Sequence, residues 1–180
     1  NVPQRYALAV EATPPPRAAL LPHIWLSDEE IRQGQRLLEQ LPDKAGTPPI
    51  ALHPYATHPD KAWKEAYWRQ LMELFESRGI PWIVIGRGNG MEGIPASRNF
   101  TNRTSLRETC ALLKSSSLLI TGDSGPMHLA GAVGTPVLAL FGPTTEEWGF
   151  FPAGPKDRVL ESQLDCRPCT LHGKKHCDRN

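Results

Sequence analysis

The chain has 180 residues, and its 20 Lys and Arg against 19 Asp and Glu give a formal net charge of +1. This balance provides no strongly basic surface for nucleic acid or for an anionic membrane. No apolar run approaches the ~20 residues that span a bilayer, and no signal segment opens the chain. Hydrophobic residues make up 39% of the sequence, which is enough for the core of one globular domain.

In chain order, the sequence predicts a helix at 27–40, a strand at 50–53, a helix at 64–77, strands at 81–86 and 99–101, a helix at 105–114, a strand at 117–121, a short helix at 126–133, and strands at 136–142 and 158–162. Two of the helix starts carry a capping box, Ser27 with Glu30 and Ser105 with Glu108. In a capping box the serine and the glutamate satisfy backbone amides of the first turn.

The expected strands are continuous apolar runs, as in "SLLIT" and "PVLALFG". A strand that is covered on both faces needs this pattern. Strands that alternate with helices predict an α/β fold with a doubly wound parallel sheet and helices on both faces. The loops after the carboxyl ends of such strands form the ligand-binding edge, which here would contain 54–63, 86–93 and 121–126.

The ends of the chain differ from this central part. Prolines cluster near the start, in "TPPPRAALLP", and the sequence stops at "KKHCDRN" without a closing helix. A proline-rich opening is typical of a linker that enters a domain. We therefore expect part of a longer protein, with a linker over 1–22, a folded domain over 23–163 and a truncated cysteine-rich tail over 164–180.

The segment "ITGDSGPMHLAGAV" contains a strand end followed directly by a helix start. Gly122 allows a sharp turn, and Pro126 suits the first turn of a helix, where no amide donor is needed. A helix start presents unpaired N–H groups and about half a positive charge. It therefore attracts phosphate, and Gly125 would leave those amides uncovered. In the alternative interpretation, Asp123 and Ser124 only cap the helix.

Two further side chains are expected near this helix start. Lys61 follows the first strand, in "HPDKAW", and a lysine there is a mobile point charge for a phosphate oxygen. Together with the helix start it predicts a diphosphate clamp without a P-loop, whereas "GRGNG" lacks the third glycine of a dinucleotide fingerprint. His128 is either a hydrogen-bonded core residue or a group that faces the bound anion.

The tail contains Cys166, Cys169 and Cys177, with His172 and His176 between the last two. A Cys-x-x-Cys pair with nearby histidines is compatible with zinc, but the spacing matches no standard zinc finger, so redox and structural roles stay open. Cys110 lies on the apolar side of a predicted helix and is expected in the core. Cysteines used in this way fit a reducing compartment.

Three segments resemble the C-terminal half of the lipopolysaccharide heptosyltransferases, glycosyltransferase family 9. They are "PYATHPDKAW", "TSLRETCALLKSSSLLITGDSGPMHLAGAVGTPVLALFGPT" and "CRPCTLHGKKHC". The resemblance runs from about residue 21 to the end. It implies the Rossmann-like half of a two-domain GT-B glycosyltransferase, in which residues 23–163 bind the nucleotide-sugar donor.

The resemblance also implies roles for individual residues. Lys61, Asp123 and His128 would form the catalytic set beside the diphosphate and the transferred sugar. Thr104 and Ser105 would lie near the base or the ribose, and the amides at the helix start would bind phosphate. The full donor-binding set implied is Thr57, Lys61, Gly86, Glu92, Thr104, Ser105, Asp123, Ser124, Gly125, Met127 and His128.

At one binding position the sequence departs from the family. Some members carry a carboxylate that binds the ribose hydroxyls, soon after the strand that ends in "IG". Here Gly88 occupies the nearest position, and Glu92 is a candidate substitute from farther along the loop.

The activity implied is transfer of heptose from ADP-heptose to a lipid-linked acceptor of the lipopolysaccharide inner core, by an inverting and metal-independent reaction. An Asp of a missing N-terminal domain would deprotonate the acceptor, so this half alone is expected to be inactive. We expect no cofactor, no bound metal and no nucleic-acid partner, and a cytoplasmic location with peripheral contact to the inner membrane. Two alternatives stay open: a nucleotide-sugar epimerase of the same architecture, and a non-enzymatic metal- or redox-linked module built on the cysteine tail.

Overall fold

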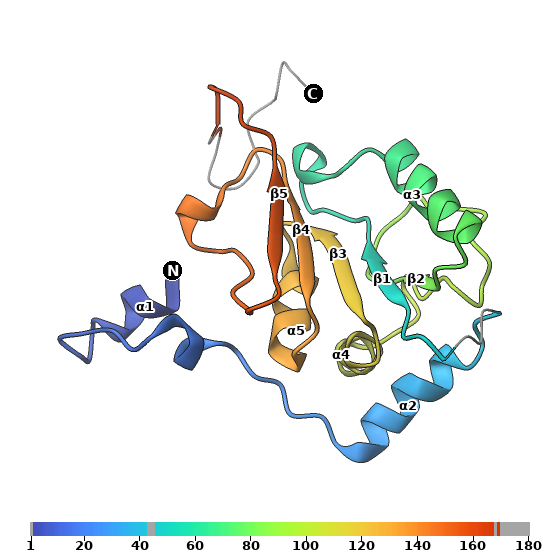
Figure 1. Cartoon of the computed structure of the whole chain (residues 1–180), viewed down its shortest axis with the longest axis horizontal. Helices are drawn as coiled ribbons and strands as arrows, with labels where there is room; N and C mark the ends of the chain where they lie inside the picture. The colour runs from blue at the N-terminus through green and yellow to red at the C-terminus, as the bar shows by residue number, and fades with distance from the viewer. Residues whose placement is uncertain (1, 43–45, 168, 170–180) are drawn as a thin grey trace.

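The computed structural model describes residues 2–42, 46–167 and 169 (Figure 1). In chain order its elements are α1 (Val2–Ala7), η1 (Arg17–Leu20), α2 (Asp28–Leu38), β1 (Ile50–His53), η2 (Pro59–Lys61), α3 (Glu65–Ser77), β2 (Trp82–Val84), α4 (Leu106–Lys114), β3 (Leu118–Gly122), α5 (Gly125–Val133), β4 (Val137–Phe141), η3 (Glu146–Trp148) and β5 (Arg158–Glu161). The main helices and strands agree with the predicted ranges to within about two residues at either end.

The five strands form one sheet in the order β2-β1-β3-β4-β5, and every neighbouring pair is parallel. This arrangement confirms the predicted doubly wound parallel sheet. The connection from β1 leads to β2 on one side, and the chain then crosses to β3 on the other side of β1. In open α/β sheets such a reversal opens a crevice outside the carboxyl ends of the strands, and here it lies between β1 and β3.

The strand predicted at 99–101 does not form. The chain instead makes a single parallel bridge between Val84 and Asn99. The Val84 N–H donates to the Arg98 carbonyl, and the Phe100 N–H donates to the Val84 carbonyl, both at 2.8 Å. The Arg98 guanidinium also donates to the Trp82 carbonyl at 3.2 Å. The short segment therefore pairs with the outer edge of β2 without continuing as a strand.

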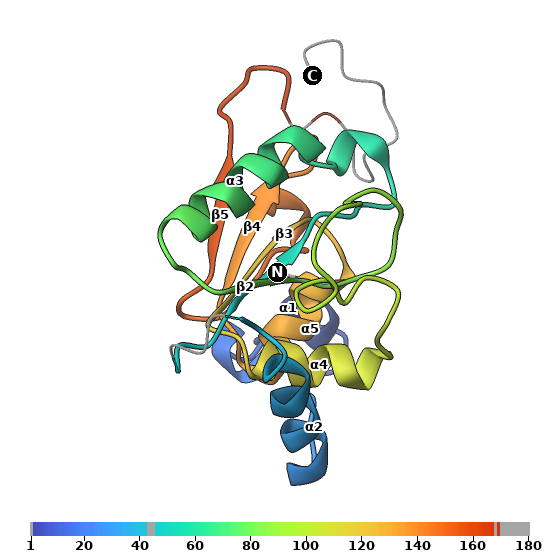
Figure 2. The same cartoon turned by 90° about the vertical axis from the view of Figure 1, so that its right-hand side faces the viewer.

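Helices cover both faces of the sheet (Figure 2). Successive strand residues point to opposite faces, so each strand contributes to two separate cores. Leu52 belongs to a buried cluster with Trp68 of α3, whereas its neighbour Ala51 belongs to a second cluster with Leu112 of α4 and Met127 of α5. The continuous apolar strands of the sequence are explained by this two-sided burial.

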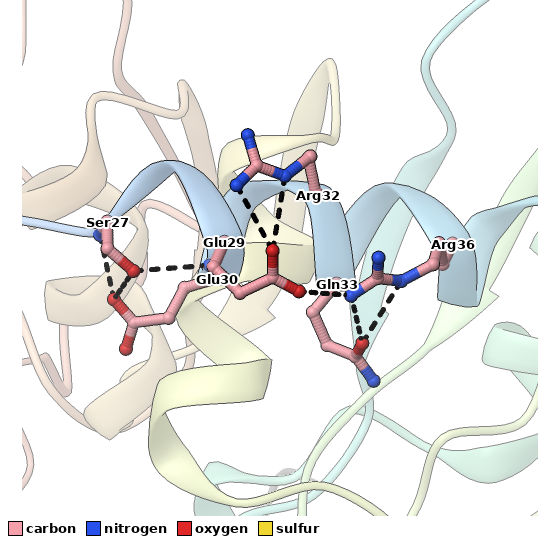
Figure 3. A network of polar contacts seen from close by, with 6 residues as sticks. All are labelled: Ser27, Glu29, Glu30, Arg32, Gln33 and Arg36. Atoms are coloured by element: carbon pink, nitrogen blue, oxygen red, sulfur yellow. Dashed lines mark hydrogen bonds and ion pairs between the residues drawn. The ribbon is translucent and has the colours of Figure 1, made fainter.

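The outer helix α2 is stabilised by polar contacts on its exposed side (Figure 3). The Ser27 Oγ accepts a hydrogen bond from the Glu30 N–H, and the Glu30 carboxylate accepts one from the Ser27 N–H, which confirms the capping box. Farther along, the Glu29 carboxylate pairs with Arg32 and Arg36. Such exposed pairs each add only a few tenths of a kcal/mol, so packing of α2 against α4 matters more.

The segment predicted as a linker contains α1 and η1. Arg17 donates to the Pro152 carbonyl at 2.8 Å, and its guanidinium lies 4.2 Å from the centre of the Phe151 ring. Beyond it, the Ile24 N–H donates to the Ala132 carbonyl at 2.8 Å. The chain before α2 is therefore attached to the sheet domain, and the division at residue 22 stays a prediction.

Candidate functional site

A cavity of about 430 Å³ opens at the carboxyl ends of β1, β2 and β3, where the strand order predicts a ligand. Five of the residues named from the sequence line it, namely Thr57, Gly86, Thr104, Ser124 and Gly125. The other lining residues are His53, Tyr55, Ala56, Arg87, Leu106, Thr109, Pro126 and Leu129. The loops at 54–63, 86–93 and 121–126 therefore all contribute at least one residue to one concave site.

Helix α5 begins at this cavity without a side-chain cap. Ser124 is its N-cap residue, in an extended conformation, but the serine hydroxyl accepts no hydrogen bond from the first turn. Among the described residues, neither the Ser124 amide nor the Gly125 amide donates a hydrogen bond. The interpretation in which Asp123 and Ser124 only cap the helix is therefore wrong. The helix start keeps free N–H groups and its partial positive charge for an anion.

Lys61 lies beside this helix start, in an ion pair. Its Nζ is 2.6 Å from the Asp123 Oδ2, and the two side chains are only 14% and 16% exposed. The loop carrying Lys61 comes close to the sheet, because a Cβ on Gly122 would lie 3.2 Å from the Lys61 carbonyl oxygen. The structure thus brings the predicted lysine to the predicted strand-to-helix turn, although neither Lys61 nor Asp123 lines the cavity itself.

Three other predicted residues lie outside the cavity lining. His128 is exposed on α5; desolvation lowers its pKa, and the nearby Asp123 charge opposes this shift. The Ser105 Oγ accepts from the Glu108 N–H at 3.2 Å and so caps α4. The Met127 side chain is 1% exposed and packs in the core, so it offers no side-chain contact to a ligand.

The position of the expected ribose carboxylate is filled by an aromatic ring. A Cβ on Gly88 would lie 2.8 Å from the Tyr55 Cγ, so no larger side chain fits there without displacing the tyrosine. The Tyr55 hydroxyl lies 2.7 Å from the Thr101 Oγ1, and this hydrogen bond fixes the ring. The candidate substitute Glu92 accepts a hydrogen bond from the Gly90 N–H instead, and it does not line the cavity.

His53 is the main site residue that the sequence interpretation missed. It ends β1 and is the register partner of Thr121 in β3, and its Nδ1 lies 3.1 Å from the Thr121 Oγ1. The ring also makes an edge contact with Tyr55, at 5.7 Å between centroids. The alternation of side chains along a strand could have indicated the position of His53. Leu52 faces α3, so the next residue, His53, must face the opposite side of the sheet, toward α5.

Burial of His53 has a consequence for stability. It lowers the pKa of the imidazole from 6.5 to about 4. The unfolded chain binds this proton near pH 6.5 and the folded chain only near pH 4, so the free energy of unfolding falls as the pH is lowered through this window. Over the whole window, the free energy of unfolding changes by about 3 kcal/mol.

Urea unfolding between pH 7 and 4.5 is expected to show that the free energy of unfolding falls more steeply with decreasing pH for the wild type than for His53→Asn. Parallel pH profiles of the two proteins would contradict the assignment of this effect to His53.

The cysteine tail lies mostly outside the described residues, which exclude Cys177, His172 and His176. Cys166 is exposed and Cys169 is partly buried, and Cys110 is buried as predicted. Within the described part of the chain, no group of three His, Cys, Asp or Glu residues could hold a metal ion. None of the helices described there is long and apolar enough to cross a bilayer.

Known proteins resemble this chain over most of its length. The family described as glycosyltransferase family 9 (heptosyltransferase) matches residues 2–177. Lipopolysaccharide heptosyltransferase 1 of Pseudomonas aeruginosa is 35% identical over 153 residues, which are 77% of this chain and 40% of that protein. The family 9 glycosyl transferase of Veillonella parvula superposes with a TM-score of 0.62 at 25% identity, over 78% of this chain and 42% of that one.

The E. coli heptosyltransferase WaaC with ADP has a TM-score of 0.53 at 25% identity, over 70% of this chain and 41% of that one. In each of these comparisons the match covers less than half of the relative's length. The family match, in contrast, covers nearly the whole chain, including the strand-to-helix turn and the lysine loop. This chain therefore belongs to glycosyltransferase family 9, the heptosyltransferases.

Proposed function

We propose that this domain binds the ADP-heptose donor of a heptosyltransferase reaction, with the diphosphate at the start of α5. The observation that carries the proposal is the uncapped first turn of α5, which opens into the cavity beside the Lys61–Asp123 ion pair. The solved relative that contains ADP supports the choice of nucleotide. The nucleoside would then occupy the cavity between Tyr55, Thr104 and Leu129.

The proposed chemistry is stabilisation of the leaving group. As the bond between heptose and diphosphate breaks, negative charge grows on the phosphate oxygen that departs with ADP. Amides fixed at the start of a helix, together with the Lys61 ammonium group, oppose this charge without having to reorganise. Because they already supply positive charge, the reaction proposed here is metal-independent.

We assign the remaining steps of the reaction to the part of the heptosyltransferases that this chain does not cover. We propose that a carboxylate there deprotonates the acceptor hydroxyl of the lipopolysaccharide inner core, giving inversion at the sugar carbon. This chain by itself would then bind donor without turnover. The full enzyme would work in the cytoplasm, at the inner face of the membrane that holds the lipid-linked acceptor.

Titration calorimetry with ADP, AMP and adenosine tests the nucleotide-binding part of the proposal. ADP is expected to bind roughly tenfold or more tightly than adenosine, because charge-assisted hydrogen bonds to the phosphates contribute about 1.5–3 kcal/mol each. AMP should fall between the two. Equal affinities for ADP and adenosine, or no binding of ADP, would contradict a diphosphate site at α5.

A further inference from the structure

Three polar side chains meet beside the cavity, which two of them, His53 and Ser124, line. The His53 Nδ1 lies 3.1 Å from the Thr121 Oγ1 and 3.2 Å from the Ser124 Oγ, and the two hydroxyl oxygens are 3.0 Å apart. They come from the end of β1, the end of β3 and the N-cap of α5. The cluster therefore joins the two strands at the crevice to the helix that starts there.

All the hydrogen-bond partners of the Ser124 hydroxyl lie at the ends of the strands, not in the first turn of α5. Its one proton goes to the Gly122 carbonyl at 3.2 Å, which also accepts from the Thr121 hydroxyl at 3.1 Å, so the Ser124 oxygen is left to accept a hydrogen bond from the His53 side. Since its pKa is lowered to about 4 by burial, His53 is neutral at pH 7. A neutral imidazole has one lone pair and one N–H; with both hydroxyl protons on the Gly122 carbonyl, the Nδ1 completes this hydrogen-bonded set as the N–H donor.

This arrangement is unusual for a serine at the start of a helix. At the starts of α2 and α4, Ser27 and Ser105 accept a hydrogen bond from the first turn, as serine at an N-cap generally does. Ser124 holds the same position in α5 and does not. Ser124 differs from both in its partners, because a buried imidazole and a threonine lie against its hydroxyl, and the Met127 N–H that a cap would use donates to the Ser124 carbonyl at 3.2 Å.

The imidazole itself is held in place. His53 is 6% exposed, and its Nδ1 side is fixed by the two hydroxyls. On the other side, a Cβ on Gly86 would lie 2.8 Å from the His53 Nε2. Among the described residues Nε2 has no hydrogen-bond partner, and the ring lines the cavity. The ring therefore has little freedom to release Ser124.

We propose that His53 is a positioning residue that holds the Ser124 hydroxyl away from the first turn of α5. A serine oxygen in the capping position would lie over the first-turn amides, where an anion has to sit. By engaging that hydroxyl at the strand end, His53 leaves the amides open to the diphosphate. This inference rests on the proposed function, since it explains how the α5 site stays available for ADP.

A double-mutant cycle tests the inference, with the Kd of ADP measured by calorimetry. His53→Leu removes Nδ1 and puts an apolar side chain of similar size in its place, and Ser124→Ala removes the competing hydroxyl. If Ser124 caps the helix once His53 is gone, His53→Leu is expected to weaken ADP binding about fivefold, because a serine cap contributes about 1 kcal/mol. In the Ser124→Ala background the same change should have less than about a twofold effect.

Two more measurements separate this role from a general structural one. His53→Asn places an amide N–H donor near the position of Nδ1 and should recover most of the affinity that His53→Leu loses. Thermal melting identifies which variants are folded, and if His53→Leu is not, His53→Met replaces it in the cycle. Equal losses from the His53 change with and without Ser124 would overturn the inference. Failure of the wild-type chain to bind ADP would instead contradict the proposed function.

Discussion

Replacement of Lys61 by alanine is expected to weaken ADP binding by roughly 30-fold or more. The ammonium group is 2.6 Å from Asp123, in a pair that is mostly buried. Its removal takes away a positive charge near the phosphates and also leaves the Asp123 carboxylate unpaired beside them. Truncating one partner of a buried charge pair typically weakens binding by about 2–5 kcal/mol, and the lower limit corresponds to the expected factor.

A nearby lysine provides the matched control for this change. Lys64 is exposed, three residues farther along, and its side chain does not cap α3, so Lys64→Ala should leave the Kd of ADP within about twofold of the wild type. The double variant Lys61→Ala/Asp123→Ala should bind ADP more tightly than Lys61→Ala alone, because the unpaired carboxylate is gone. Calorimetry that gives the same Kd for wild type and Lys61→Ala would refute the phosphate role of Lys61.

The second large effect is expected for Gly86→Ala, on stability. Gly86 has a φ of 118°, which side chains rarely adopt, and its added Cβ would lie 2.8 Å from the His53 Nε2 and 3.0 Å from Tyr55. Both neighbours are held by their own hydrogen bonds. Backbone strain and overpacking each contribute about 1–3 kcal/mol, so the free energy of unfolding should fall by about 3 kcal/mol.

Gly93→Ala separates the two contributions. Gly93 also has a positive φ, 83°, but a Cβ there would meet nothing within 4 Å. Urea unfolding should therefore show a loss of about 1 kcal/mol from backbone strain alone. If both alanine variants lose the same free energy, the contact between Gly86 and the His53–Tyr55 pair does not constrain the fold.

Much of this fold follows from local sequence patterns. The capping serines, the helical spacing of apolar residues and the continuous apolar strands each act over a few neighbouring residues. They predicted the main helices and the five strands of the sheet, whereas the strand expected at 99–101 forms only a single bridge. The parallel sheet followed from the alternation of strands and helices. Because parallel strands share one carboxyl edge, the approach of Lys61 to the start of α5 could also be anticipated.

The parts that could not be predicted depend on the direction of side chains between distant segments. Ser105 was expected both to cap a helix and to contact the donor, and the structure uses its hydroxyl for the cap. Met127 lies on the buried side of α5, with Ala130 in the same core cluster, so helical spacing argued against a ligand contact. Tyr55 and His53 contact each other through strand pairing and loop conformation, which no short pattern in the sequence reveals.

The two borders of the sheet bear on how the protein behaves at high concentration. Open strand borders offer unpaired backbone groups to other chains and promote aggregation. One border is partly covered, since the Arg98–Phe100 segment pairs with Val84 on the free side of β2. At the opposite border, β5 is only four residues long and begins and ends with the charged residues Arg158 and Glu161. Short length and charge both discourage strand addition there, so we expect little pairing of a second chain with this border.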